Sequence, residues 1–211
     1  PITSAPYFFG VSFNGTTLAA MGNGAVFTST NGITWTKRVL PPPSGSTTAF
    51  VNGMVWTGSE FVIAGQAVWT STTGTTWTLR PDLSFLTNLS LRWTGTEIIA
   101  FHTQGIYYTS ATGAFWTDRS ANLVSAPLGA GKVGNTFLTI SYGGRIDGQS
   151  SLGTWTPSHS TGLANSASDF AHNGSLFVAI GPNCSWTSTA GTSWTQHIQS
   201  NFDARRISWD G

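Results

Sequence analysis

Short apolar runs alternate with tight-turn residues along the whole chain, and no run keeps a sustained helical period. Runs such as FVIAG (61–65) and FVAIG (177–181) follow a Gly-containing turn and precede a segment that is rich in aromatic residues. Runs of this length that are bounded by Gly, Asn and Thr are typical of β-strands. The pattern therefore predicts an all-β chain of many short strands.

The predicted strands recur in a fixed order. A first strand ends at a glycine, an apolar second strand and an aromatic third strand follow, and a Gly-containing turn leads into a fourth strand that begins at Trp-Thr. The segments that contain the first strand are VSFNG (11–15), MVWTG (54–58), LRWTG (91–95), GKVGN (131–135) and FAHNG (170–174). This order predicts repeated units of four strands joined by tight turns.

The unit has a nearly constant length. The tryptophans that close its five copies are 42, 39, 39 and 39 residues apart, at Trp35, Trp77, Trp116, Trp155 and Trp194. Four-stranded units that recur about every 40 residues are typical of β-propeller blades. We predict a single propeller domain over 1–211, with repeats at approximately 7–45, 46–84, 85–124, 125–164 and 165–204. The segment RRISWDG (205–211) matches one more first strand, so we expect five blades, or six if the chain is truncated.

The turn between the third and fourth strands has the form STNGITW (29–35) in the first repeat. It resembles the Asp-box, the S-x-D-x-G-x-T-W turn of BNR-repeat propellers, although the acidic position holds Asn31, Thr73, Thr112, Leu152 and Ala190. The resemblance implies a structural turn on the blade periphery, in which Gly accepts a positive φ, Ser bonds the backbone and Trp packs between blades. These structural positions are Ser29, Gly32, Trp35, Ser71, Gly74, Trp77, Ser110, Gly113, Trp116, Gly153, Trp155, Ser188, Gly191 and Trp194.

Charge is scarce in this chain. Charged residues make up 8% of it, against roughly 25% in typical globular proteins, and the net charge is +1. The balance does not fit a nucleic-acid-binding protein, which usually carries a basic excess. The single cysteine, Cys184, cannot form a disulfide within the chain. Surfaces rich in Ser, Thr, Asn and Gly are common on extracellular, cell-surface and virion proteins, so we expect such a location.

Two sets of side chains recur at fixed positions and could bind a ligand. Aromatic residues recur in the first and third strands, and their faces could stack on sugar rings or fill the space between blades. Basic residues recur three positions after the turn tryptophan, and they could bind an anionic glycan or a partner's carboxylates, or form one structural hydrogen bond in each blade. The candidate ligand-binding residues are Trp56, Trp93, Trp69, Arg38, Arg80 and Arg119.

Catalytic groups are few. Sialidases, which also carry Asp-boxes, need an arginine triad for the substrate carboxylate, a Tyr–Glu nucleophile pair and an Asp that acts as the acid. This chain has only two glutamates, Glu60 and Glu97, and both follow a first-strand turn. We expect most of the six aspartates to lie in connections between blades, with no pair that would suit a glycosidase. The segment GAGKVG (129–134) matches a dinucleotide-binding glycine motif, but it belongs to the first strand of a repeat. The histidines do not show the spacing of metal ligands. We predict no catalytic residue, no metal and no cofactor.

Three functions remain open. The first is a non-catalytic recognition or adhesion propeller on a virion or cell surface, which binds a glycan or a surface receptor, in the manner of a tail-fibre protein. The second is a structural assembly or decoration module that contacts neighbouring virion or surface proteins. The third is a fragment of a sialidase-like glycoside hydrolase. We expect no nucleic-acid partner and no membrane insertion, and we expect the chain to be part of a larger chain or assembly.

Overall fold

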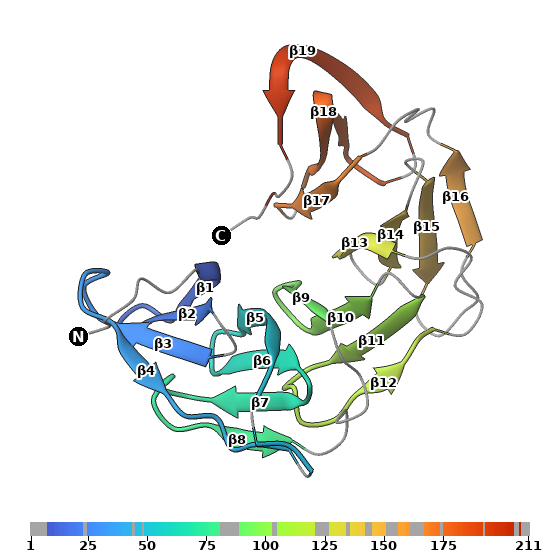
Figure 1. The fold of residues 1–211 in the computed structure, drawn as a ribbon. Coiled ribbons are helices and arrows are strands. Elements are labelled where there is room, and N and C mark those ends of the chain that lie inside the picture. The colour runs from blue at the N-terminus through green and yellow to red at the C-terminus, as the bar shows by residue number, and fades with distance from the viewer. Residues whose placement is uncertain are drawn as a thin grey trace. The chain divides into compact units, whose positions relative to one another are not determined.

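A computed structural model describes residues 8–22, 25–43, 45–47, 49–80, 89–102, 105–120, 127–133, 136–141, 145–150, 156–160, 167–173, 175–191, 193–204 and 207. These residues form strands and turns and contain no helix (Figure 1). They therefore include no helix that is long and apolar enough to span a membrane. The predicted all-β class is confirmed.

The strands form five antiparallel sheets, and neighbours along the chain pair with one another inside each sheet. The first sheet is β1 (Phe8–Phe13), β2 (Leu18–Gly22), β3 (Ala25–Ser29) and β4 (Thr36–Arg38). The second sheet is β5 (Val51–Trp56), β6 (Phe61–Gly65), β7 (Val68–Ser71) and β8 (Thr78–Arg80). The third sheet is β9 (Ser90–Trp93), β10 (Ile98–His102), β11 (Ile106–Ser110) and β12 (Thr117–Asp118).

The last two sheets follow the same order. The fourth sheet is β13 (Pro127–Val133), β14 (Thr136–Ser141), β15 (Arg145–Ser150) and β16 (Thr156–Ser160). The fifth sheet is β17 (Asp169–His172), β18 (Phe177–Ser188) and β19 (Thr195–Asp203). Here the expectation of four strands was wrong. β18 runs through Pro182 and Asn183 with a register irregularity between Pro182 and Cys184, where Asn183 adopts a φ of 58°, a conformation that Asn tolerates better than most residues.

The structure divides into two compact units. The first unit comprises Pro1–Ala100 and Tyr108–Thr117, and the second comprises Phe101–Tyr107 and Asp118–Gly211. The division runs through the third sheet. The single domain and the number of blades stay predictions.

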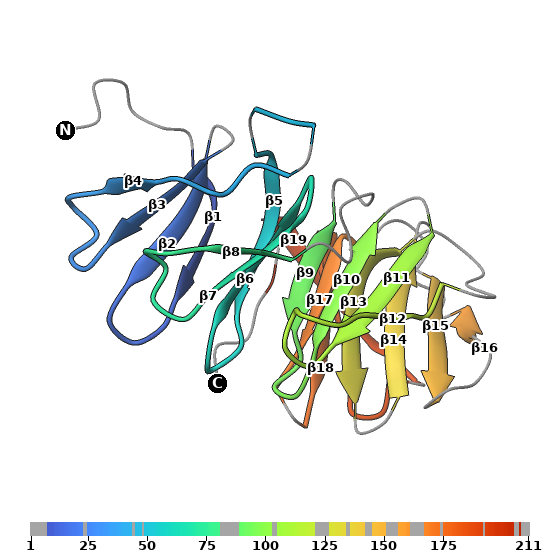
Figure 2. The same cartoon turned by 90° about the horizontal axis from the view of Figure 1, so that it is seen from below.

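The core of the first unit lies between the first and second sheets, which are neighbours in Figure 2. Ala19, Met21 and Val26 of the first sheet pack in one cluster with Ile63 and Trp69 of the second. Side chains alternate between the two faces of a strand, so this cluster defines which face of each sheet is turned to its neighbour. The face of β2–β3 that holds Val26 is covered by the face of β6–β7 that holds Trp69.

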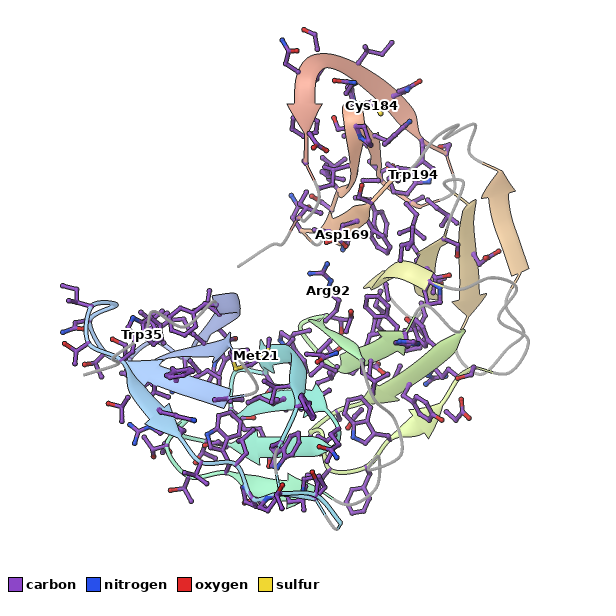
Figure 3. All side chains as sticks on the ribbon, in the orientation of Figure 1. Met21, Trp35, Arg92, Asp169, Cys184 and Trp194 are labelled. Atoms are coloured by element: carbon purple, nitrogen blue, oxygen red, sulfur yellow. The ribbon has the colours of Figure 1, made fainter. Side chains whose placement is uncertain are left out.

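The second unit repeats this arrangement with the fourth and fifth sheets. Leu138, Ile140 and Ile146 of the fourth sheet share a cluster with Phe177 and Trp186 of the fifth. The thiol of Cys184 lies in the same cluster, where the residue is buried (Figure 3). In both units, the later sheet of the pair contributes large aromatic side chains to the shared core.

Candidate functional site

The turns between the third and fourth strands have one hydrogen-bonding pattern. The serine hydroxyl accepts the N–H of the glycine at 2.9, 2.8, 2.8 and 2.9 Å, at Ser29–Gly32, Ser71–Gly74, Ser110–Gly113 and Ser188–Gly191. The indole N–H donates to the carbonyl of that glycine at 3.1, 2.9, 3.0 and 3.2 Å, at Trp35, Trp77, Trp116 and Trp194. These side chains are therefore committed to the turn itself. Gly153 and Trp155 of the fourth copy lie outside the described residues.

The position that resembles the acidic residue of an Asp-box still accepts backbone hydrogen bonds. Asn31 Oδ1 accepts the N–H groups of Ile33 and Thr34, both at 2.9 Å. Thr73 and Thr112 replace it with a hydroxyl that accepts a single N–H, at 3.2 and 3.3 Å. A side-chain oxygen thus orders the turn without an acidic group in three of the repeats.

Trp69 differs from the other candidates because it is not at the surface. Its exposed fraction is 0%, and it belongs to the core of the first unit. Its indole N–H donates to the carbonyl of Pro41 at 2.8 Å, so even its polar edge is occupied. The structure places Trp69 where it fills the space between two sheets, so we do not carry it forward as a ligand-contacting residue.

The recurrent basic residues form hydrogen bonds within their own sheets. Arg38 Nε donates to Thr28 Oγ1 at 2.7 Å, and Arg80 Nε donates to Thr70 Oγ1 at 3.1 Å. His197 repeats the contact, with Nε2 lying 2.9 Å from Thr187 Oγ1. The guanidinium of Arg119 lies 4.5 Å from the centre of the Phe137 ring, a cation–π geometry. Each of these cations therefore has a structural contact.

Replacing Arg80 with Met should destabilise the chain by about 1–2 kcal/mol, because the buried hydroxyl of Thr70 loses the donor that it accepts from. The double variant R80M/T70V should recover most of that loss, since it removes both partners of the bond. Urea denaturation of the two variants measures the difference, with Lys37→Met on the exposed outer strand β4 as the control. Equal stability of R80M and wild type would contradict the structural role.

Three aromatic side chains occupy one position at the end of neighbouring strands. Phe13, Trp56 and Trp93 are the last residues of β1, β5 and β9, and β5 lies beside both β1 and β9. Phe13 is 53% exposed, and the two tryptophans are half-buried. We call these three residues the aromatic row. All three belong to the first unit.

Trp56 shows how the row is held. Its ring lies 4.7 Å from the ring of Phe61, which in turn lies 6.3 Å from the ring of Trp77. The inner side of Trp56 therefore rests on other aromatic rings, while part of the side chain stays accessible. A rigid, partly exposed aromatic side chain suits ligand or protein contact, because little conformational entropy is lost on binding.

Sequence reasoning missed one member of this row as a candidate. Phe13 takes the same place in its first strand as Trp56 and Trp93 take in theirs, but only the two tryptophans are among the predicted ligand-binding residues. In the structure Phe13 is exposed, whereas Trp56 and Trp93 are half-buried. The sequence did contain a signal for Phe13, since each of the three residues lies two positions before a turn glycine.

The second unit does not continue the row with aromatic residues. Lys132 and His172 take the equivalent positions, at the ends of the first strands of the fourth and fifth sheets. The ring of His172 lies 4.2 Å from that of Phe177, and Lys132 Nζ lies 5.2 Å from the centre of the Phe137 ring. Both side chains thus rest on the phenylalanine that their residue pairs with on the neighbouring apolar strand. Trp209 lies outside the described residues.

Burial lowers the pKa of His172 below its ordinary value of 6.5. The unfolded chain therefore binds a proton at this residue more readily than the folded chain does. Its contribution to stability should be fully present above about pH 6.5 and should be lost as the pH falls below that value. Urea midpoints at about pH 7.5 and pH 5.5 measure this loss. His172→Phe should show a smaller difference between the two pH values, and an unchanged difference would contradict the assignment.

The acidic residues that the structure describes are distributed over the second to fifth sheets and their turns. Glu60 and Glu97 lie in equivalent first-strand turns, where their backbone groups bond Thr57 and Thr94. The expectation that the aspartates lie mostly in connections was wrong for the described ones, which belong to strands: Asp118, Asp147, Asp169 and Asp203. The same residues contain no group of three or more His, Cys, Asp or Glu side chains that could hold a metal ion.

No protein-family model and no curated protein matches the chain. Solved β-propeller structures do resemble it. YCF48 bound to D1 peptide matches with a TM-score of 0.66 and 16% identity over 94% of this chain and 68% of that chain. A chain of the nidogen/laminin complex matches with a TM-score of 0.64 and 10% identity, over 97% and 84% of the two chains. Virginiamycin B lyase from Staphylococcus aureus gives 0.63 and 10%, over 99% and 75%.

These likenesses concern the fold alone, because the identities are low. They confirm the predicted β-propeller class. Membership of the Asp-box family stays a prediction, since no family model matches.

Proposed function

We propose that this chain is a non-catalytic recognition propeller that binds its partner through the aromatic row. The observation that carries the proposal is the row itself, in which Phe13, Trp56 and Trp93 are partly exposed at one position of three neighbouring strands. Aromatic side chains of this kind dominate binding energy at recognition surfaces. The repeated turns are degenerate Asp-boxes, whose serines, glycines and tryptophans have a structural role.

The partner is a surface protein or a glycan on a cell or virion. Proteins of the same fold support a protein partner, since YCF48 is described bound to a D1 peptide and nidogen in complex with laminin. The spaced aromatic faces support a glycan, whose apolar ring faces can stack on them. Arg38 and Arg80 mainly stabilise the fold, because their Nε–H groups donate hydrogen bonds to threonine hydroxyls.

An assembly module is the second candidate, and a separate observation favours it. Several large apolar side chains outside the aromatic row are strongly exposed, among them Ile33 at 84%, Phe115 at 81% and Ile198 at 84%. Exposed apolar side chains of this size would be removed from water if a neighbouring protein covered them. Sedimentation of the purified chain at increasing concentration tests this candidate.

The test of the recognition function is a glycan-array screen of the purified chain, followed by a tryptophan-fluorescence titration of any hit. Surface-protein ectodomains displayed on a second array cover the protein partner. Phe13→Ser should weaken a true hit at least about tenfold, as expected for loss of an exposed aromatic contact. Phe115→Ser is the matched control, because it removes an exposed phenylalanine at an outer turn. Equal binding by both variants, or no hit on either array from folded protein, would refute the proposal.

A further inference from the structure

One face of the fourth sheet is polar where the second sheet is apolar. In the second sheet, Ile63 of β6 pairs with Trp69 of β7, and both side chains are buried in the core. In the fourth sheet, the corresponding pair is Thr139 of β14 and Asp147 of β15. The repeat therefore replaces an isoleucine and a tryptophan with a hydroxyl and a carboxylate.

The polar residues of this face are fully enclosed. Thr139, Ser141 and Asp147 each have an exposed fraction of 0%. Phe137, Thr139 and Ser141 share one face of β14, because side chains alternate along a strand. The ring of Phe137 lies 6.1 Å from that of Tyr107, which is also fully buried, so the face is turned toward Tyr107 within the second unit.

Two hydroxyls on this face lack a protein partner. Thr139 Oγ1 and Ser141 Oγ are buried and form no hydrogen bond with any protein group. Buried hydroxyls of this kind are normally paired, because an unpaired one loses its hydration without compensation. The threonines at another buried position behave as expected, since Thr28 and Thr70 accept hydrogen bonds from arginines. The hydroxyls of Thr139 and Ser141 in the fourth sheet thus depart from this rule.

We propose that Thr139 and Ser141, with the carboxylate of Asp147, form a buried structural water site. An ordered internal water makes about three hydrogen bonds and can both donate and accept. It can therefore donate to the carboxylate and exchange hydrogen bonds with the two hydroxyls. This site does not depend on the recognition function, because it lies inside the second unit and not on the aromatic row.

A hard cation fits this set less well than water does. Calcium takes about six to eight oxygen ligands, usually with several carboxylates. The face offers one carboxylate and the hydroxyls of Thr139 and Ser141, which is fewer oxygens than such an ion requires. Water satisfies the same oxygens without any net charge, so it is the occupant that this chemistry favours.

A crystal structure of the whole chain at high resolution tests the site directly. We expect an ordered water within about 3 Å of Thr139 Oγ1 or Ser141 Oγ. Hydroxyls that turn onto protein acceptors, or a metal ion in place of the water, would overturn the proposal. A thermal midpoint that rises with added calcium and falls with a chelator would identify the metal ion.

Stability measurements give an independent answer from the same residues. Thr139→Val keeps the shape of the side chain and removes its hydroxyl. If water occupies the site, this variant should unfold at a lower urea concentration than wild type, because the water loses a partner. If the site is dry, it should unfold at a higher concentration, because an unpaired hydroxyl has been removed, and that result would overturn the proposal. Thr136→Val, at the partly exposed start of β14, is the control.

Discussion

Replacing Trp69 with Ala should destabilise the first unit by about 3–5 kcal/mol, as expected for truncation of a large buried aromatic side chain. The side chain is fully buried between the first and second sheets, next to Met21, Val26 and Ile63. Truncation would leave a cavity in the core, and it would also leave the carbonyl of Pro41 without the indole N–H that bonds it at 2.8 Å. Urea denaturation followed by circular dichroism measures the loss.

Trp69→Phe is the matched control for this prediction. Phe27 occupies the equivalent position in β3, where it pairs with Ala20 as Trp69 pairs with Ile63. A phenylalanine therefore fits the backbone at this position, and its cost should fall to about 2 kcal/mol, for the lost hydrogen bond and a smaller cavity. A Trp69→Ala variant as stable as wild type would mean that Trp69 is not a core residue.

The same residue shows where sequence reasoning failed. The repeat pattern predicted an aromatic third strand, and Trp69 lies in β7, but the pattern alone could not show which side chains are covered. Trp69 lies in the middle of the third strand, where a neighbouring sheet covers it, whereas Trp56 lies at a strand end. Burial depends on contacts between repeats, and those contacts are not encoded in the composition of a single repeat.

The turns were easier to predict because their geometry is local. The serine, glycine and tryptophan of each copy lie within seven residues of one another in positions such as 29–35, and their hydrogen bonds join residues three apart. Such bonds follow from the sequence without knowledge of the neighbouring sheets. The long strand β18 was not predicted, because the repeat pattern indicated separate second and third strands, whereas residues 177–188 form a single strand with a register irregularity between Pro182 and Cys184.

The fourth repeat shows a further limit of the alignment. Its first strand and its buried strands matched the other repeats well enough to predict a four-stranded sheet, which the structure contains. However, Asp147 takes the place of an aromatic residue in that sheet. A pattern that averages over repeats hides such a replacement, and only the burial of Asp147 and Thr139 shows its physical consequence.

Replacing Gly113 with Ala should destabilise the chain by about 2–5 kcal/mol, because two costs combine at this position. Gly113 has a φ of 78°, which costs an alanine roughly 1–2 kcal/mol. A Cβ at this position would also lie 2.9 and 3.0 Å from the two γ-methyl groups of Val62 in the second sheet. Forcing an extra carbon into a packed contact costs about 1–3 kcal/mol more.

Gly58 separates the two costs. It has a φ of 92°, but a Cβ there would meet no atom within 4 Å. Gly58→Ala should therefore carry the backbone cost alone, about 1–2 kcal/mol. Urea midpoints of the two variants measure the difference, which reports the close approach of the Gly113 turn to Val62. If Gly113→Ala costs no more than Gly58→Ala, the turn does not pack against the second sheet. If it costs clearly more, the glycine of this turn serves the packing of one sheet on the next as well as the turn conformation.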